Sequence, residues 1–269
     1  PIPRDKEYEL KYAKGIVKKT FIRSWYSFLK MQSKVAPKMH NIISPSKSSK
    51  NDIQKYFHID ASKIHVIPNG IDTGIFKPNL MISKKPFKLI TTASADVPLK
   101  GLDFTLRAIA IAKDKYPLIN LVVIGKPRSG GHTERLISKL GIDEFVSFKT
   151  NLTNQEVSDE YASSQIAIVS SLYEGFGFPV GEAMACAVPL IATDVASIPE
   201  ITGPYAEMIT PESHEDIFNS LDNIFQSYDH YMKKANLGRD HILQNFSWSV
   251  IANSYIDHIS SILTSHADI

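Results

Sequence analysis

The sequence predicts an α/β protein built on a doubly wound, Rossmann-like parallel sheet. From residue 86 onward, short apolar segments alternate with segments of helical periodicity. The apolar segments are nearly continuous, as in strands that are covered by helices on both faces. The composition is also that of a globular protein, with 43% hydrophobic and 22% charged residues, and the longest apolar run, 118–125, is too short to cross a bilayer.

The elements of this sheet follow one another in regular order. We expect strands over 87–95, 119–125, 144–150, 165–171 and 188–193. The segments between them have helical apolar spacing or a polar start followed by good helix formers, and they predict helices over 102–116, 132–141, 154–164 and 178–187. A strand that alternates with a helix in this way forms parallel βαβ units.

The two flanks of this region differ from it. After residue 211 the chain becomes helical and amphipathic, with Ser213 and Ser247 as expected N-caps. Before residue 72, a basic, aromatic helical stretch over 15–40 precedes a short strand over 41–46 and a capped helix over 46–57, and a Pro-Asn-Gly turn follows at 68–70. We therefore expect part of another domain with its linker over 1–72, the sheet domain over 73–245 and a C-terminal helix over 246–269.

Charge and cysteine content narrow the class of protein further. Residues 1–66 hold 14 Lys and Arg against 5 Asp and Glu, so the formal net charge of +2 hides two regions of opposite sign. A single cysteine, Cys186, excludes a disulfide framework and a cysteine-based zinc site and suits a reducing cytoplasm. The nine histidines have no metal-ligand spacing. The opening residues lack the pattern of a signal peptide and resemble the middle of a longer polypeptide.

Residues 170–203 carry the clearest chemical signal. Glu174 follows an expected strand, glycines at 175 and 177 allow close approach of a ligand to the backbone, and Pro179 opens a helix that bears Glu182. The free N–H groups of a helix start form an anion site that fits a phosphate. Glu174 would then face the part of the ligand beyond the phosphate, and Glu182 would face a ribose diol.

Each of these residues also has a plain structural alternative. Alone, Glu174 and Glu182 could be a loop acid and a helix-start acid that interact with the helix dipole. Gly175 and Gly177 could begin a dinucleotide fingerprint, but the third glycine, Gly181, comes one place late. Lys126 and Arg128, beside two glycines, could hold a phosphate or lie on a surface loop.

The segment Glu174-x7-Glu182 resembles the signature of the family-4 retaining glycosyltransferases, also called group 1, and other motifs support the resemblance in the same order. They are the turn at 67–72, the Lys-Gly turn and helix at 99–110, the strand at 121–127 and the Phe-Ser-Trp at 246–248. The resemblance covers nearly the whole chain. It implies the GT-B architecture, in which two Rossmann-like domains face each other across a cleft. Residues 1–72 would then be a remnant of the first domain with its linker, and 246–269 would be a crossover helix that returns toward it.

The resemblance also implies roles for single residues. Glu174 would be the catalytic carboxylate that binds hydroxyls of the donor sugar, beside the backbone of Gly175, Phe176 and Gly177. Glu182 would bind the ribose, and Lys100 would reach the pyrophosphate. No metal or other cofactor is implied, and retention would come from front-face attack assisted by the leaving phosphate.

The sequence departs from the family pattern at two places. The family has Gly-Arg-x4-Lys-Gly, but Ala95 stands at the arginine position, so one phosphate contact is absent or comes from Lys126 or Arg128. The acceptor-binding domain is almost wholly absent, because residues 1–66 resemble only its last helix, strand and helix. We therefore expect the donor-binding half of an enzyme whose other half is truncated or lies on a separate chain.

Two functions remain open at this stage. The first is transfer of a hexose from a UDP- or GDP-sugar to an acceptor hydroxyl, and the second is a non-catalytic module that binds a nucleotide or a partner protein. Trp25 and Phe28, among basic residues, could bind an anionic membrane surface, although packing on the absent domain is the favoured interpretation. We expect a cytoplasmic protein, peripheral on a membrane at most, with no nucleic-acid partner.

Overall fold

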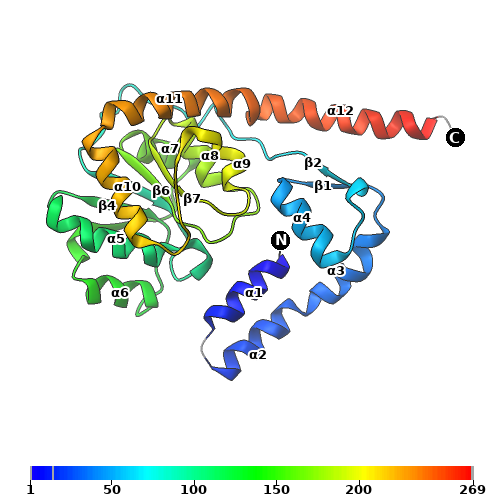
Figure 1. The fold of residues 1–269 in the computed structure, drawn as a ribbon, viewed down its shortest axis with the longest axis horizontal. Coiled ribbons are helices and arrows are strands. Elements are labelled where there is room, and N and C mark those ends of the chain that lie inside the picture. The colour runs from blue at the N-terminus through cyan, green and yellow to red at the C-terminus, as the bar shows by residue number, and fades with distance from the viewer. Residues whose placement is uncertain (1, 14, 268–269) are drawn as a thin grey trace.

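The computed structural model describes residues 2–13 and 15–267, and within them six parallel strands form the main sheet (Figure 1). The strands are β3 (Lys88–Thr92), β4 (Asn120–Ile124), β5 (Val146–Lys149), β6 (Ile166–Val169), β7 (Leu190–Thr193) and β8 (Glu207–Ile209). Their spatial order is β5-β4-β3-β6-β7-β8. This is the doubly wound order, which reverses between β3 and β6. The predicted α/β fold class is confirmed.

Helices cover both faces of the sheet. They are α5 (Leu102–Lys115), α6 (His132–Leu140), α7 (Asn154–Ala162), α8 (Phe178–Ala185), α9 (Ile198–Thr202), α10 (His214–Gln226) and α11 (Tyr228–Asn245), with one-turn 3-10 helices η4 (Pro98–Lys100), η5 (Asp143–Phe145) and η6 (Gly203–Tyr205). All five predicted strands and four predicted helices are found at their places, each a little shorter than expected. The sequence prediction omitted β8, because three residues are too few to show a pattern.

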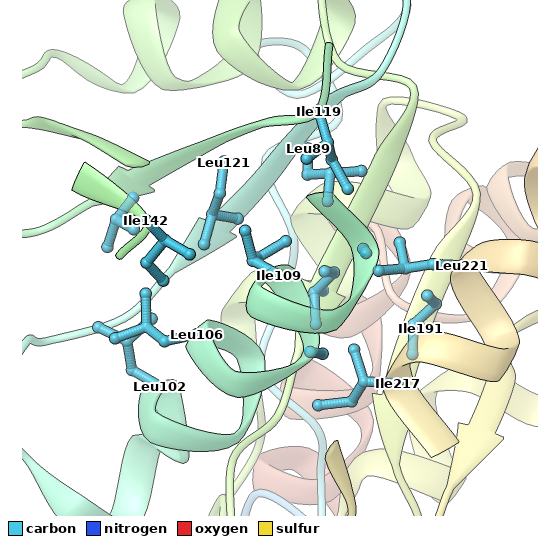
Figure 2. Packing of buried hydrophobic residues seen from close by; sticks show 14 of the residues in the cluster. Leu89, Leu102, Leu106, Ile109, Ile119, Leu121, Ile142, Ile191, Ile217 and Leu221 are labelled. Carbon is cyan, nitrogen blue, oxygen red and sulfur yellow. The ribbon is translucent and has the colours of Figure 1, made fainter. Parts of the chain in front are cut away.

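The core consists of two hydrophobic clusters, one on each face of the sheet. Neighbouring strand residues alternate between them: Leu89 and Ile168 point to one cluster, and Ile90 and Ala167 to the other. Figure 2 shows the first cluster, where α5 and α10 pack on the strands. Burial on both faces explains why the strand segments are continuously apolar.

The amino-terminal residues form a smaller unit beside the sheet domain. It contains α1 (Ile2–Tyr12), α2 (Ile16–Trp25), α3 (Leu29–Val35), β1 (Ile42–Ser44), α4 (Lys47–Phe57) and β2 (Ile64–Val66), with 3-10 turns η1 (Tyr26–Phe28), η2 (Ala36–Lys38) and η3 (Ala61–Lys63). Strands β1 and β2 pair in parallel through the crossover helix α4, which Ser46 caps as predicted. The predicted division of the chain near residues 72 and 245 stays a prediction.

The aromatic side chains of the basic stretch divide between core and surface. Tyr26 is buried and packs with Ile22 and Ala13, whereas Trp25 is 66% exposed.

None of the described helices is both long and apolar enough to span a bilayer.

The last helix, α12 (Trp248–Ala267), extends beyond the sheet domain (Figure 1). Its start is joined to the linker, because the Ile71 N–H donates to the Phe246 carbonyl at 2.7 Å. Farther along, the rings of His258 and His65 of β2 lie 4.2 Å apart between centroids. Ser247 precedes α12 as predicted for an N-cap, and its hydroxyl lies 3.0 Å from that of Ser249. The helix therefore bridges the sheet domain and the β1–β2 unit.

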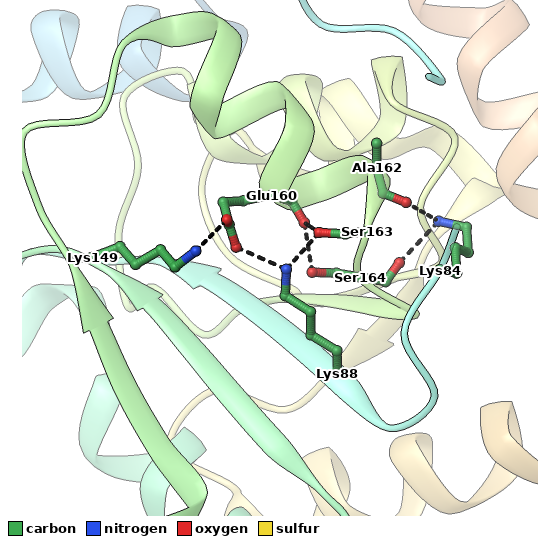
Figure 3. A network of polar contacts seen from close by, with 7 residues as sticks. All are labelled: Lys84, Lys88, Lys149, Glu160, Ala162, Ser163 and Ser164. Carbon is green, nitrogen blue, oxygen red and sulfur yellow. Dashed lines mark hydrogen bonds and ion pairs between the residues drawn. The ribbon is translucent and has the colours of Figure 1, made fainter. Parts of the chain in front are cut away.

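A polar network of lysines lies beside the amino-terminal end of β3 (Figure 3). Lys88 Nζ donates to Glu160 Oε2 at 2.8 Å and to Ser163 Oγ at 2.5 Å, and Lys149 pairs with the other carboxylate oxygen. Burial alone would raise the pKa of Glu160, but the hydrogen bonds from Lys149 and Lys88 lower it. Lys84 donates to the Ser164 carbonyl near the end of α7, and burial lowers its pKa to about 8.

Replacing Glu160 by Ala should destabilise the protein strongly. The Lys88 side chain is only 8% exposed, so the change leaves a buried ammonium without its carboxylate. We expect a loss of about 3 kcal/mol in the free energy of unfolding, measured by urea denaturation.

Lys149→Ala is the matched control, because it removes the 44% exposed partner of the same carboxylate. It should cost less than about 1 kcal/mol. Equal losses in the two variants would contradict this assignment of the buried pair.

Candidate functional site

The site lies where the strand order of the main sheet reverses. Strands β3 and β6 are neighbours, and the chain leaves their carboxyl ends toward opposite faces of the sheet. A crevice at such a switch point is the usual ligand site of doubly wound sheets. The two loops that border it are 93–101, after β3, and 170–177, after β6.

A close backbone contact fastens these two loops together. Gly101 has φ +62°, and a Cβ there would lie 1.9 Å from the carbonyl oxygen of Ser170, so only glycine fits. The Leu172 N–H donates to the Leu99 carbonyl at 2.7 Å, and the Ser170 hydroxyl donates to the Gly101 carbonyl at 3.0 Å. Helix η4, which ends at Lys100, is therefore held against the loop after β6.

This contact brings Lys100 and Glu174 together. Lys100 Nζ donates to Glu174 Oε1 at 2.8 Å, and the Ser171 hydroxyl donates to the same oxygen at 2.7 Å. The Glu174 side chain is 12% exposed and the Lys100 side chain 29% exposed, so the ammonium is the more accessible partner. Two residues that lie 74 positions apart in the sequence thus form one charged pair at the crevice.

The start of α8 leaves several N–H groups free. Gly177 has φ +101° at the N-cap and no side chain caps the helix. Among the described residues, no hydrogen-bond partner is found for the N–H groups of Gly175, Phe176 and Gly177. The Phe176 ring packs between Phe178 and Phe246, which keeps this loop close to the sheet domain. Free N–H groups and the positive end of the helix dipole favour an anion at this place.

Glu182 is a half-buried acid in α8. Burial raises its pKa to about 7, and within the described part of the chain its carboxylate has no hydrogen-bond or ion-pair partner. A half-buried acid whose pKa is raised and that has no protein partner is typical of a binding site. The carboxylate can accept hydrogen bonds from two neighbouring hydroxyls of a ligand.

The predicted roles of Lys126 and Arg128 in binding a phosphate stay predictions. Both lie on the exposed loop after β4, and no described hydrogen bond or ion pair joins their side chains to Lys100 or Glu174. Ala95 is buried at 7% exposure. Beside it, the Asp96 carboxylate accepts from the N–H groups of Arg128 at 2.8 Å and Thr133 at 2.9 Å. This loop is thus held by a carboxylate next to the place where the family has an arginine.

Sequence reasoning missed the side chains that support the loop. Backbone or side-chain groups of the site are held by Ser171, Ser197 and Asp96, yet none of the three belongs to a local pattern that predicts such a role.

Cys186 follows α8 directly. It is a free, buried thiol, and burial raises its pKa to about 12.

A hollow borders η4, and neither Lys100 nor Glu174 is among the described residues that line it. The hollow, of about 420 Å³, lies between α1–α2 and the starts of α5 and α6, with Lys18, Asp96, Pro98 and Arg135 in its lining. Across the described residues, no group of three or more His, Cys, Asp or Glu side chains is arranged to hold a metal ion.

Comparison with known protein families gives two matches. The family described as "Glycosyl transferases group 1" matches residues 76–241, which is more than half of the chain. The family described as "Glycosyltransferase Family 4" matches residues 9–74. The boundary between the matches falls in the linker that precedes β3.

Two curated relatives cover most of this chain. It is 34% identical over 255 residues to the MMP alpha-(1->4)-mannosyltransferase of Mycolicibacterium hassiacum, a match that covers 94% of this chain and 61% of that protein. It is 23% identical to the phosphatidylinositol N-acetylglucosaminyltransferase gpi3 subunit of Schizosaccharomyces pombe, over 72% of this chain and 42% of that protein. The chain therefore spans less than two thirds of the length of these relatives.

Among solved structures, Anabaena HepE in complex with UDP and glucose superimposes with a TM-score of 0.77 at 19% identity. The match covers 87% of this chain and 66% of that chain. At this identity the similarity shows a shared fold.

Glu182 should make the stability of the ligand-free protein depend on pH. Its pKa is about 7 in the folded protein against an ordinary value of 4.5, so the folded state binds more protons between these values. Stability should therefore fall as the pH rises from about 4.5 to 7, by at most about 3 kcal/mol from this residue. Urea denaturation at a series of pH values measures the change.

Glu182→Gln is the control, because the amide keeps the size of the side chain and cannot ionise. The variant should become progressively more stable than the unaltered chain as the pH rises from 5 to 8. A constant difference across that range would show that Glu182 does not titrate there.

Proposed function

The chain belongs to the group 1 glycosyl transferases, and we propose that it transfers a hexose from a UDP- or GDP-sugar to an acceptor hydroxyl. The family match and the position of the crevice support a donor site at the reversal point of the sheet.

The donor would lie across the start of α8. Its pyrophosphate would occupy the space between Lys100 and the free N–H groups of the loop that ends at Gly177. Its ribose would lie on Glu182, inside α8. The observation that carries this placement is the Glu182 carboxylate, which has no protein partner among the described residues and whose pKa burial raises to about 7, because a vicinal diol could donate hydrogen bonds to both of its oxygens.

Lys100 and the loop before α8 would stabilise the negative charge that develops on the donor phosphate during transfer. Breaking the bond between the sugar C1 and the phosphate oxygen puts negative charge on the phosphate, which the Lys100 ammonium and the loop N–H groups would stabilise without a metal ion. Glu174, held by Lys100 and Ser171, would bind hydroxyls of the sugar. The acceptor oxygen would form its bond to C1 on the same face and pass its proton to the leaving phosphate, so that the configuration is retained.

The comparisons suggest which donors to test first. The relative at 34% identity is a mannosyltransferase, which favours mannose as the sugar. The structural neighbour binds UDP and glucose, which keeps a uridine nucleotide among the candidates. Both sugars are hexoses, and the proposed donor is accordingly a hexose linked to UDP or GDP.

A binding module that does not catalyse transfer is the second candidate. Ala95 favours it, because the buried methyl side chain cannot supply the phosphate contact that the family arginine gives. Such a module would still bind the nucleotide through Glu182, but it would not transfer sugar.

Calorimetric titration of the chain with UDP, GDP and NAD tests the proposal. One of the two nucleoside diphosphates should bind, and Glu182→Ala should weaken that binding at least about tenfold, since it removes a two-oxygen acceptor for the ribose. Lys100→Ala should weaken it by a similar factor, because one cationic contact to the phosphates is lost.

Lys139→Ala is the control for Lys100→Ala, because Lys139 is an exposed lysine in the last turn of α6. Its affinity should match that of the unaltered chain. Binding of NAD in preference to both diphosphates, or nucleotide binding that is unaffected by Glu182→Ala, would refute the proposed donor site. Nucleotide binding without sugar transfer, in the presence of the rest of the enzyme, would favour the module.

A further inference from the structure

Three consecutive carbonyl groups of the 174–176 loop accept hydrogen bonds from serine side chains. The Ser197 hydroxyl lies 2.8 Å from the Glu174 carbonyl oxygen and 2.7 Å from that of Phe176, so its proton is shared between them. The carbonyl between these two, that of Gly175, accepts from Ser46 at 2.8 Å and from Ser49 at 2.9 Å. Ser46, Ser49 and Ser197 are 3% exposed or less. We call these three residues the serine clamp.

Because the peptide bond is planar, the clamp also fixes the directions of N–H groups in the loop. In a trans peptide, the N–H of one residue points opposite to the carbonyl of the residue before it. Fixing the carbonyls of 174, 175 and 176 therefore fixes the directions of the N–H groups of Gly175, Phe176 and Gly177. These are the N–H groups for which no partner is found among the described residues. They are the groups proposed to receive the donor.

Two members of the clamp come from outside the sheet domain. Ser46 and Ser49 belong to the first turn of α4, in the amino-terminal unit. That turn is docked on the sheet domain by Glu200 of α9, whose two carboxylate oxygens accept from the N–H groups of Lys47 and Ser48 at 2.7 and 2.8 Å. A carboxylate at a helix start is favourable both as a hydrogen-bond acceptor and toward the helix dipole. The contact of Glu200 with the start of α4 thus holds the amino-terminal unit against the 174–176 loop.

We propose that the serine clamp consists of positioning residues that aim the N–H groups of residues 175–177 at the donor, and that the α4 unit is therefore part of the donor site. The inference rests on the proposed function. None of the three hydroxyls needs to touch the donor, because each acts through the carbonyl that it holds. The physical role is preorganisation: the loop is held in its binding conformation before the ligand arrives, so binding does not have to order it.

Ser49→Ala is the most direct test, because Ser46 also caps α4 whereas the Ser49 hydroxyl bonds only to the Gly175 carbonyl among the described contacts. We expect Ser49→Ala to weaken binding of UDP or GDP, whichever the unaltered chain binds, about threefold to tenfold. Ser197→Ala, which releases two carbonyls, should weaken it about tenfold or more. Ser49→Thr, which keeps the hydroxyl, should restore affinity to within about twofold of the unaltered chain.

Ser213→Ala serves as the control for a lost serine contact elsewhere, because the Ser213 hydroxyl caps α10 by accepting from the Asp216 N–H. It should leave nucleotide affinity unchanged. If Glu182→Ala abolishes binding while Ser49→Ala and Ser197→Ala bind like the unaltered chain, the inference is wrong and the proposed function stands. If the unaltered chain binds neither UDP nor GDP, the proposed function fails and the inference fails with it.

Discussion

The arrangement of the site depends on the close approach of Gly101 to the Ser170 carbonyl. Strands β3 and β6 are adjacent although they are far apart in the sequence, and the chain leaves them toward opposite faces. A side chain at Gly101 would push the two loops apart, since its Cβ would lie 1.9 Å from that carbonyl oxygen. With glycine there, η4 lies on the loop after β6 and Lys100 meets Glu174 at 2.8 Å. The loop after β6 then leads directly into α8.

Two partly buried carboxylates of this fold, those of Glu160 and Glu182, differ in their hydrogen-bond partners. Glu160 accepts hydrogen bonds from Lys88 and Lys149, which lower its pKa against the effect of burial. Within the described residues Glu182 has no such partner, and burial raises its pKa to about 7. The first arrangement contributes to holding the sheet domain together, whereas the second leaves a half-buried acid open to a ligand at the proposed donor site. The N–H groups of the loop before α8 likewise have no hydrogen-bond partner among the described residues. The serine clamp holds the carbonyls of that loop.

The sequence predicted the sheet, its helices and the loop after β6 that bears Glu174, because these follow from local periodicity and from the rule that parallel strands end at one edge. It did not predict β8, whose three residues carry no periodicity. The pairing of Lys100 with Glu174 needed the strand order, which local pattern does not contain. The serine clamp was missed for the same reason: Ser46 and the Gly175 carbonyl lie 129 positions apart, and a serine before a helix predicts only a cap.

A crystal structure of the chain with bound UDP or GDP tests the central claim most directly. The account predicts that the diphosphate lies at the start of α8, between Lys100 and the N–H groups of Phe176 and Gly177, with the ribose hydroxyls on the Glu182 carboxylate. It also predicts that the loop keeps its conformation, with the Gly175 carbonyl still held by Ser46 and Ser49. A nucleotide bound away from α8, or a ribose that does not contact Glu182, would contradict the account.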